Sequence, residues 1–345
     1  MSNIIENNTD PQYQTLVRDI SSTFEQGRNK TKKAINAGLI NTYWKVGQHI
    51  VEFEQQGEVS ATYGGKLLES LSNDLKLRYG KGFSLSNLKR FRQFYLSNRN
   101  SATLSHQLSW SHYVELLKVS NETERSFYQN QTISANWSVR ELKRQKDSGL
   151  FLRLASSKDK DQVLALAQKG QLIEKPEDVQ RDSYVFEFLG LPENNYFSER
   201  ELENALCENL EHFLLELGKG FTFVGRQYRV TLNNTHYKVD LVFYHRILRC
   251  FVLIDLKINE VKHQDIGQMN MYMGYFAKEE NIEGDNPPIG IILSKDKDEL
   301  LVEYATYGMD TQLFVQKYQL YLPNEEELRH EVELTLEKVA QDQKS

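Results

Sequence analysis

Residues 238–257 read KVDLVFYHRILRCFVLIDLK, and this stretch decides how the second half of the chain is interpreted. Two apolar runs are joined by a short polar turn. Both runs are rich in Val, Ile, Leu, Phe and Tyr, which predicts two strands. We expect them to pair as an antiparallel hairpin centred between Ile247 and Leu248.

Ionisable side chains interrupt both apolar runs at corresponding places. In the predicted hairpin Asp240 lies directly opposite Asp255, with their Cβ atoms about 5 Å apart on one face. Lys257 shares that face, because strand side chains alternate with a period of two. Two carboxylates this close repel each other unless a cation lies between them. The pattern therefore predicts a divalent metal site.

The composition is that of a soluble globular protein. The chain has 345 residues, 39% hydrophobic and 26% charged, and a net charge of −6, which does not indicate nucleic-acid binding by itself. Cys207 and Cys250 are too few for a disulfide framework and suit a reducing, cytoplasmic environment. No signal peptide and no apolar run of about 20 residues is found, so we expect no membrane association.

Hydrophobic periodicity divides the chain into three parts. Residues 1–155 are predicted to be helical, with one helix over residues 31–54. Residues 156–182 are polar and are predicted to be a linker carrying one short helix. Residues 183–345 alternate between helical and strand patterns, which predicts an α/β domain with a mixed central sheet flanked by helices and a charged C-terminal helix.

An acidic helix is predicted upstream of the hairpin. Ser198 is the expected N-cap, and the helix is predicted to run to Leu217. Glu203 borders its apolar stripe and can reach the sheet face, whereas Glu208 is less suitably placed. A solvated acidic face is the alternative.

These residues resemble a known superfamily. Asp240, the Asp255-Leu256-Lys257 triplet, an upstream helical Glu, and Gln268-x-x-x-Tyr272 on the following helix resemble the PD-(D/E)XK nucleases. More narrowly, FLLELGKGFTFVGRQ at 213–227, DLVFYH at 240–245 and residues 267–272 resemble the YhcG-type branch. The first half of the chain resembles the helical domain that accompanies such nuclease domains.

The resemblance implies a metal-dependent phosphodiesterase that uses Mg²⁺, with Mn²⁺ as the alternative. The implied metal ligands are Asp240, Asp255, Glu203 and the carbonyl of Leu256. Lys257 is implied to position or deprotonate the attacking water, or to donate to the transition state. Gln268 and Tyr272 lie one turn apart and are implied to orient Lys257 or the scissile phosphate.

Two positions depart from the superfamily pattern. Val239 replaces the common Pro, and Asp255 stands where this branch more often has Glu, which retracts that ligand by one methylene. A purely structural ion cluster is the competing interpretation of Asp240, Asp255 and Lys257. One Lys cannot neutralise two carboxylates, and buried ion clusters stabilise weakly, so the metal site is favoured.

Other polar residues near the hairpin are weaker candidates. His245 and His263 fit no metal-ligand spacing and are expected to be a turn residue and a helix-start residue. Arg226 follows a predicted strand and could contact a phosphate backbone or serve the structure.

A segment in the helical part is basic, although the chain as a whole has a net negative charge. Residues 75–99 contain no acid. A helix, a Gly-containing turn and a second helix capped by Ser84 or Ser86 predict a helix-turn-helix, winged-helix-like module that binds DNA. Its candidate phosphate contacts are Lys76, Arg78, Lys81, Lys89, Arg90 and Arg92. A solvated basic face, or one that docks an acidic protein, is the alternative.

The predicted function is Mg²⁺-dependent hydrolysis of DNA, in genome maintenance, mobile-element biology or restriction-associated defence. RNA as the substrate and a catalytically silent nuclease fold that binds nucleic acid or assembles a complex are the rivals. Because such domains cut one strand each, a homodimer or larger assembly is expected, alongside protein partners of a defence or repair system. The candidate contact is the C-terminal helical stripe of Leu328, Val332, Leu336 and Val339.

Overall fold

The structure is a computed structural model of the chain. It describes residues 11–55, 66–99, 104–105, 107–156, 158, 160–179, 183–191, 197–296, 298–307, 312–322, 324, 326–330 and 332–333. None of the helices in these ranges is both long and apolar enough to cross a bilayer.

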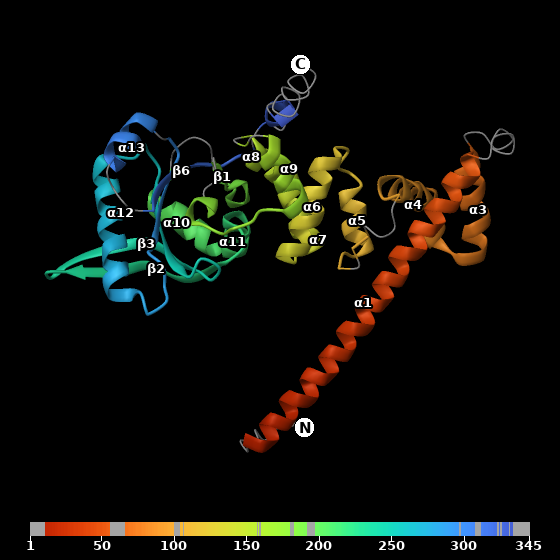
Figure 1. Cartoon of the computed structure of the whole chain (residues 1–345), viewed down its shortest axis with the longest axis horizontal. Coiled ribbons are helices and arrows are strands. Elements are labelled where there is room, and N and C mark those ends of the chain that lie inside the picture. Colours follow the sequence, from red (N-terminus) through yellow and green to blue (C-terminus); the bar gives the residue numbers. More distant parts are fainter. Residues whose placement is uncertain are drawn as a thin grey trace. The chain divides into compact units, whose positions relative to one another are not determined.

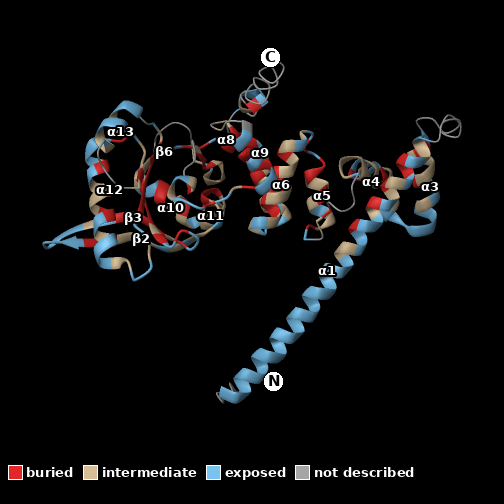
Figure 2. Ribbon diagram, in the orientation of Figure 1, coloured by how far each residue is buried: buried red, intermediate tan, exposed pale blue. Residues whose placement is uncertain are grey.

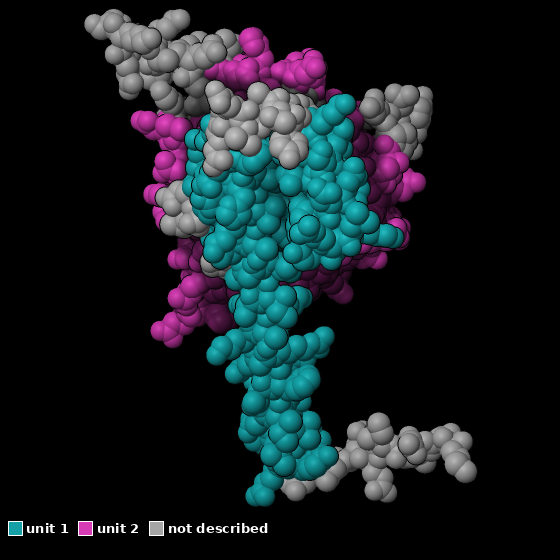
Figure 3. Space-filling model, turned by 90° about the vertical axis from the view of Figure 1, so that its right-hand side faces the viewer, with its two compact units in different colours: residues 1–121 teal, residues 122–345 magenta. Residues whose placement is uncertain are grey.

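The chain packs as two compact units, residues 1–121 and 122–345 (Figure 3). The helices between residues 122 and 169 therefore belong to the same compact unit as the sheet. One tie is the hydrogen bond from Gln145 Nε2 to the carbonyl of Leu215, 2.9 Å long. The compact units do not test the predicted division into domains 1–155 and 183–345, because a domain boundary need not coincide with a boundary between compact units. That division stays a prediction.

The first unit is helical in its described residues. Its elements are α1 (Pro11–Gln55), α3 (Leu67–Tyr79), η2 (Lys81–Phe83), α4 (Leu85–Ser97) and α5 (Trp110–Leu116) (Figure 1). Ile50, Leu88 and Phe91 form its core, and Ser84 caps α4 by accepting a hydrogen bond from Asn87 N–H. The helix predicted over 31–54 begins 20 residues earlier. The inward-facing stripe starts only near Ile40, so periodic burial does not mark the earlier turns.

The second unit begins with helices and continues into a six-stranded sheet. The helices are α6 (Glu122–Ala135), α7 (Val139–Asp147), α8 (Leu150–Ala155), α9 (Lys160–Lys169) and η4 (Pro176–Val179). The strands are β1 (Ser183–Val185), β2 (Phe221–Leu232), β3 (Thr235–His245), β4 (Cys250–Lys257), β5 (Ile289–Ser294) and β6 (Leu313–Gln319). Their order is β1-β6-β5-β4-β3-β2, with β2, β3 and β4 antiparallel and the rest parallel, which confirms the predicted mixed sheet.

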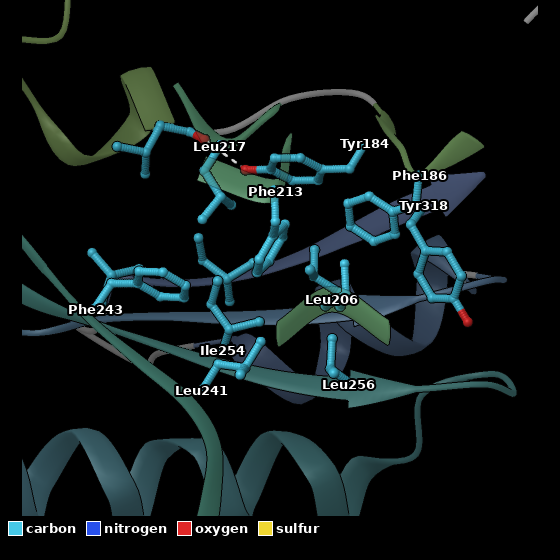
Figure 4. Packing of buried hydrophobic residues seen from close by; sticks show 14 of the residues in the cluster. Tyr184, Phe186, Leu206, Phe213, Leu217, Leu241, Phe243, Ile254, Leu256 and Tyr318 are labelled. Atoms are coloured by element: carbon cyan, nitrogen blue, oxygen red, sulfur yellow. Dashed lines mark hydrogen bonds between the residues drawn. The ribbon is translucent and has the colours of Figure 1, made fainter. Parts of the chain in front are cut away.

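Helices cover both faces of this sheet. One face carries η5 (Glu187–Leu189), α10 (Glu199–Glu208) and α11 (Leu210–Leu217). The other carries α12 (His263–Tyr275), η6 (Phe276–Glu280) and α13 (Glu299–Thr306). Figure 4 shows Phe213 and Leu206 packed over Phe243, Ile254 and Leu256 of the central strands. This apolar core fixes the middle of β3 and the end of β4, where the ionisable residues lie.

Two local predictions differ from the structure. The helix predicted from Ser198 to Leu217 is broken into α10 and α11 at Asn209, whose φ of −109° is not helical. The sequence pattern predicts separate strands at 221–224 and 228–232, but they form one strand, β2, with a register shift between Phe223 and Gly225. Glycine is a residue that such an irregularity tolerates.

The C-terminal stripe is only partly described. Residues 326–330 are helical, and Val332 is buried with an exposed fraction of 3%. Arg329 Nη1 lies 3.0 Å from Glu124 Oε2 on α6 of the same unit. Leu336 and Val339 lie outside the described residues. The described part of the stripe thus packs on its own unit.

Candidate active site

Asp240 and Asp255 lie on the neighbouring strands β3 and β4, close enough for the charge of one to act on the other. In the β3–β4 hairpin Leu241 pairs with Ile254 and His245 with Cys250, which confirms the predicted register. The same register continued by one residue sets Asp240 opposite Asp255. Asp240 reaches β4 directly, because its Oδ2 accepts a hydrogen bond of 2.8 Å from the backbone N–H of Leu256.

The side chains of β3 lose their regular alternation between the two faces of the sheet near Asp240, and β2 is irregular beside it. Val239 packs in the cluster on α12, whereas Leu241 packs in the cluster on α10 and α11. In a regular strand these two side chains would share a face. On the neighbouring strand Gln227 has φ of +50°, a left-handed conformation that is uncommon for a residue other than glycine. The break turns Asp240 and Gln227 out of the ordinary pleat.

Gln227 bridges two carboxylates. Its Nε2 donates to Asp240 Oδ1 at 3.0 Å and to Glu203 Oε2 at 2.6 Å. Glu203 is buried on α10, with 4% of its surface exposed, whereas Glu208 on the same helix is exposed. The structure therefore joins Glu203, and not Glu208, to the aspartate cluster.

Lys257 forms the cationic part of the cluster. Its Nζ lies 2.6 Å from Asp255 Oδ2 and 3.9 Å from Asp265 Oδ1 on α12. Burial by itself lowers the pKa of Lys257, but the charge and hydrogen bond of Asp255, together with the charges of Glu199 and Asp265, outweigh burial and the net pKa is raised. Lys257 is therefore an ammonium at neutral pH, which favours the role of donor over that of base.

Burial and like charge act on the acids. Burial, followed by the charge of Asp240, raises the pKa of Asp255 to about 7 against the opposing charge of Lys257. Burial also raises the pKa of Glu203, and the charge of Asp240 adds to this. Because the folded-state pKa of Asp255 lies above its ordinary value of 3.8, the free energy of unfolding falls as the pH rises between that value and about 7. A bound cation would remove this penalty.

The carboxylate oxygens that could bind a metal lie near one another in the described residues, but they do not converge on one point. No group of three or more His, Cys, Asp or Glu side chains in the described ranges is positioned to hold an ion. Two contacts account for this, namely the Gln227 amide between Glu203 and Asp240 and the Lys257 ammonium on Asp255. The donor chemistry nevertheless fits, because hard divalent cations prefer carboxylate oxygens.

Gln268 and Tyr272 lie beside the site but bond elsewhere than predicted. Gln268 Nε2 donates to the Tyr272 hydroxyl, which donates to the carbonyl of Lys238 at 2.8 Å. Tyr272 is fully buried, and burial raises its pKa. The pair anchors the backbone of β3 two residues before Asp240, and the charged partners of Lys257 are Asp255 and Asp265 instead.

Comparisons with known proteins agree with this arrangement. The family model described as the YhcG PDDEXK nuclease domain matches residues 177–333, and that of the DUF1016 N-terminal domain matches residues 19–153. The Escherichia coli (strain K12) protein named "Putative nuclease YhcG" is 36% identical over 352 residues, covering 93% of this chain and 93% of that protein. The chain belongs to the YhcG family of PDDEXK nucleases.

A solved structure was also matched. The crystal structure of a repair endonuclease from Pyrococcus abyssi is 19% identical, with a TM-score of 0.26, over 38% of this chain and 50% of that chain.

The YhcG-family site also contains residues whose role the sequence did not reveal. The sequence predicts for Gln227, as for Arg226, a possible contact with a phosphate backbone, and it assigns Asp265 no role. A Gln beside a strand Arg carries no pattern that predicts a bridge between carboxylates. Arg226 itself is exposed and donates to Asn204 Oδ1 on α10 at 3.0 Å.

His245 is structural, in agreement with its prediction. It is fully buried, its Nδ1 accepts from Leu248 N–H at 3.1 Å, and its Nε2 lies 3.1 Å from the carbonyl of Lys219. The ring therefore donates through Nε2 and is neutral, and burial lowers its pKa. His263 is exposed at the start of α12.

The basic segment of the first unit divides into free and engaged residues. Lys76, Arg78, Lys81 and Lys89 are exposed. Arg92 instead forms an ion pair of 2.8 Å with Glu54 on α1, and Arg90 donates to Asn87 Oδ1 at 3.1 Å. The described residues of this unit form no strand, so no wing is seen beside α3 and α4.

Proposed function

We propose that this chain is a cytoplasmic, metal-dependent nuclease that hydrolyses phosphodiester bonds in DNA. The observation that carries the proposal is the closeness of Asp240 to the end of β4, where its Oδ2 accepts from Leu256 N–H and its charge acts on Asp255, with Lys257 paired to Asp255, in a member of a nuclease family. Two opposed carboxylates and an ammonium have no evident structural purpose at the end of apolar strands.

We assign a separate role in the proposed reaction to each residue of the site. Asp240, Asp255, Glu203 and the carbonyl of Leu256 are the proposed ligands of Mg²⁺, with Mn²⁺ as the alternative. A bound ion of this kind lowers the pKa of its water and screens charge on the transferred phosphoryl group. Lys257, held by Asp255 and Asp265, donates to the phosphate. Gln227 keeps Glu203 and Asp240 together when the acids are otherwise unscreened.

The test is cleavage of a panel of substrates. Purified protein is incubated with supercoiled plasmid, linear duplex DNA, single-stranded DNA and structured RNA, with Mg²⁺, Mn²⁺ or EDTA. We expect metal-dependent cleavage of DNA that is absent from a Lys257→Ala preparation. Cleavage of RNA alone would move the substrate to RNA. Binding without any cleavage would favour a silent nuclease fold.

We further propose that α3 and α4 of the first unit contact the DNA backbone. Lys76, Lys81 and Lys89 are exposed, and the segment that contains them has no acid. A variant with Ala at Lys81 and Lys89 should lower the slope of log affinity against log salt by about 0.9 for each lost phosphate contact. Ala at Arg92, which is paired with Glu54, should change the slope much less. An unchanged slope in the first variant would exclude these helices as a DNA contact.

A dimer is the third part of the proposal, and it places the contact on α1 and not on the C-terminal helix. The N-terminal part of α1 is exposed (Figure 2), and it carries an apolar stripe along one face of the helix between residues 13 and 39. The stripe consists of Tyr13, Leu16, Val17, Ile20, Phe24, Ile35 and Leu39, each between 41% and 67% exposed. At roughly 100 Å² each, these side chains supply about 700 Å² per copy, close to the about 800 Å² per partner of a stable interface.

A second copy in antiparallel orientation complements this stripe. Residues 13–26 carry a net charge of −1 from Arg18, Asp19 and Glu25, and residues 27–39 carry +4 from Arg28, Lys30, Lys32 and Lys33, so reversing one helix sets the acidic half against the basic half. Phe24 would then lie against Gly27 of the partner, where nothing lies within 4 Å of an added Cβ. Two copies also provide the two active sites that cutting both strands requires.

Sedimentation velocity checks the dimer. The unaltered chain should sediment as a dimer, and Phe24→Glu should convert it to a monomer. Leu77→Glu is the control, because Leu77 is 88% exposed but lies on α3. Asp19→Lys should weaken the dimer, and adding Lys33→Asp should restore it. A monomeric wild type, or a dimer that Phe24→Glu leaves intact, would contradict the interface.

A further inference from the structure

The hairpin of β2 and β3 continues beyond the rest of the sheet. β3 pairs with β4 only from Leu241 to His245, whereas its pairing with β2 runs on to Thr235 opposite Leu232. Residues 228–239 therefore form a two-stranded ribbon, which Figure 1 shows projecting from the second unit. Asn233 and Asn234 at its tip have φ of +45° and +62°, as in the tight two-residue turns of hairpins. At about 3.4 Å per residue, the ribbon reaches roughly 20 Å beyond the aspartates.

The two faces of the ribbon differ in chemistry. Tyr228, Val230, Tyr237 and Val239 belong to the apolar cluster on α12, with Tyr228 and Phe276 at 5.1 Å between ring centroids. The opposite face carries two cross-strand pairs, Arg229 with Lys238 and Thr231 with His236, and all four residues are exposed. The break at Gln227 thus changes which residues face α12 and leaves a wholly polar outer face.

The outer face carries unneutralised positive charge. Arg229 lies directly opposite Lys238, and like charges opposed across a strand pair are destabilising. Residues 218–239 contain no acid, in a chain whose net charge is −6. Within the described ranges no ion pair joins either residue to a carboxylate, and Arg229 Nη2 instead lies 2.6 Å from His236 Nε2. Positive charge that costs stability and has no carboxylate partner among the described residues fits an external anion.

The positive face continues to the acidic site. Lys238 precedes Asp240 by two residues, a step of about 7 Å along the strand. Arg226, on the near side of the break, is exposed, and its charge and that of Arg200 act on Glu203. The carboxylates are therefore flanked by cations on the ribbon and on α10. A nucleic-acid backbone could place one phosphate at the proposed metal ligands. The neighbouring phosphates would then lie against these cations.

We propose that the outer face of the ribbon, through Arg229 and Lys238, binds backbone phosphates of duplex DNA next to the scissile bond. This inference rests on the proposed nuclease function and adds its duplex substrate. The major groove of B-form DNA is about 12 Å wide and admits a two-stranded ribbon, whereas that of A-form RNA is deep and narrow. The ribbon therefore distinguishes duplex DNA from duplex RNA by shape.

The test measures duplex binding in EDTA, where metal-dependent cleavage is absent, as a function of salt. The double variant Arg229→Ala/Lys238→Ala should bind duplex DNA more weakly, with the slope of log affinity against log salt reduced by up to about 1.8 for two lost contacts. Its thermal midpoint should equal or exceed that of the unaltered chain, because the substitution removes a repulsion. A binding loss with an unchanged or raised midpoint separates lost contact from lost fold.

A matched variant removes the same charge elsewhere. Lys278→Ala/Lys317→Ala deletes two exposed lysines, on η6 and on β6 toward the far edge of the sheet, and should keep the slope. An unchanged slope in the ribbon variant, with plasmid cleavage intact, would overturn the ribbon and leave the nuclease proposal standing. An equal loss on duplex RNA would overturn the assignment to DNA. A wild type that neither binds nor cuts any nucleic acid would overturn both proposals.

Discussion

Asp240→Asn should lower the rate of DNA cleavage about 1,000-fold or more while leaving the fold intact. Asparagine has the size of aspartate, and its amide oxygen can still accept the hydrogen bond from Leu256 N–H that holds the side chain against β4. It loses the negative charge, which is the property that a divalent cation requires. Single-turnover cleavage of labelled duplex DNA at saturating protein measures the chemical step without interference from product release.

Variants of Glu203 and Glu208, which both lie on α10, complete this experiment. Glu203→Gln should reduce the rate, because Glu203 reaches Asp240 through Gln227. Glu208→Gln should not, because Glu208 is exposed on the same helix and provides the matched control. Circular dichroism and the thermal midpoint report whether each variant is folded. Full activity in Asp240→Asn, or equal losses in the two glutamate variants, would place the reaction away from this cluster.

Glu216→Ala should destabilise the second unit by about 3–5 kcal/mol, a large part of the 5–15 kcal/mol that typically holds a domain folded. Glu216 is fully buried on α11, and its Oε1 accepts from Arg153 Nη1 at 2.7 Å and from the backbone N–H of Val185 at 3.0 Å. Arg144 Nη1 lies 3.7 Å from its other oxygen. The carboxylate thus joins α7, α8 and β1, and its removal leaves the charge of buried Arg153 uncompensated.

Urea unfolding followed by circular dichroism measures this loss as a lower midpoint at an unchanged slope. Glu211→Ala is the control, because Glu211 is exposed on the same helix and should shift the midpoint little. Glu216→Gln should fall between the two, since the amide retains an acceptor for Val185 but carries no charge. Equal midpoints for Glu216→Ala and Glu211→Ala would show that the buried cluster contributes nothing to stability.

Features of the site that depend on residues close together in the sequence could be predicted, and those that depend on distant residues could not. The register that opposes Asp240 to Asp255 depends only on hairpin length and alternation, and the sequence contains both. The bridge through Gln227 depends on a left-handed backbone residue and on a helix more than 20 residues away, and no short pattern encodes either. Tyr272 was placed correctly on its helix, but its partner, the carbonyl of Lys238, is fixed by tertiary packing.

The fold shows the same division between local and tertiary causes. The mixed sheet was predictable because its strands are continuous apolar runs. The full length of α1 was not, because an exposed helix buries no face that would reveal its period. Glu216 left a trace in the sequence, a lone charge in the apolar stripe Leu214-Leu215-Glu216-Leu217, yet its partners Arg153 and Val185 come from distant segments.

The change of alternation at Asp240 and Gln227 divides β3 into a segment with the proposed catalytic residues and an arm that can vary independently. The proposed reaction would constrain the residues on the core side of that point, because β4 and α10 hold them in place. On the far side, adding or deleting two residues in each strand would preserve which side chains face outward. It would change the length of the arm by about 7 Å. A lineage of such proteins could thus adjust how far along the double helix it grips without disturbing the chemistry of the cut.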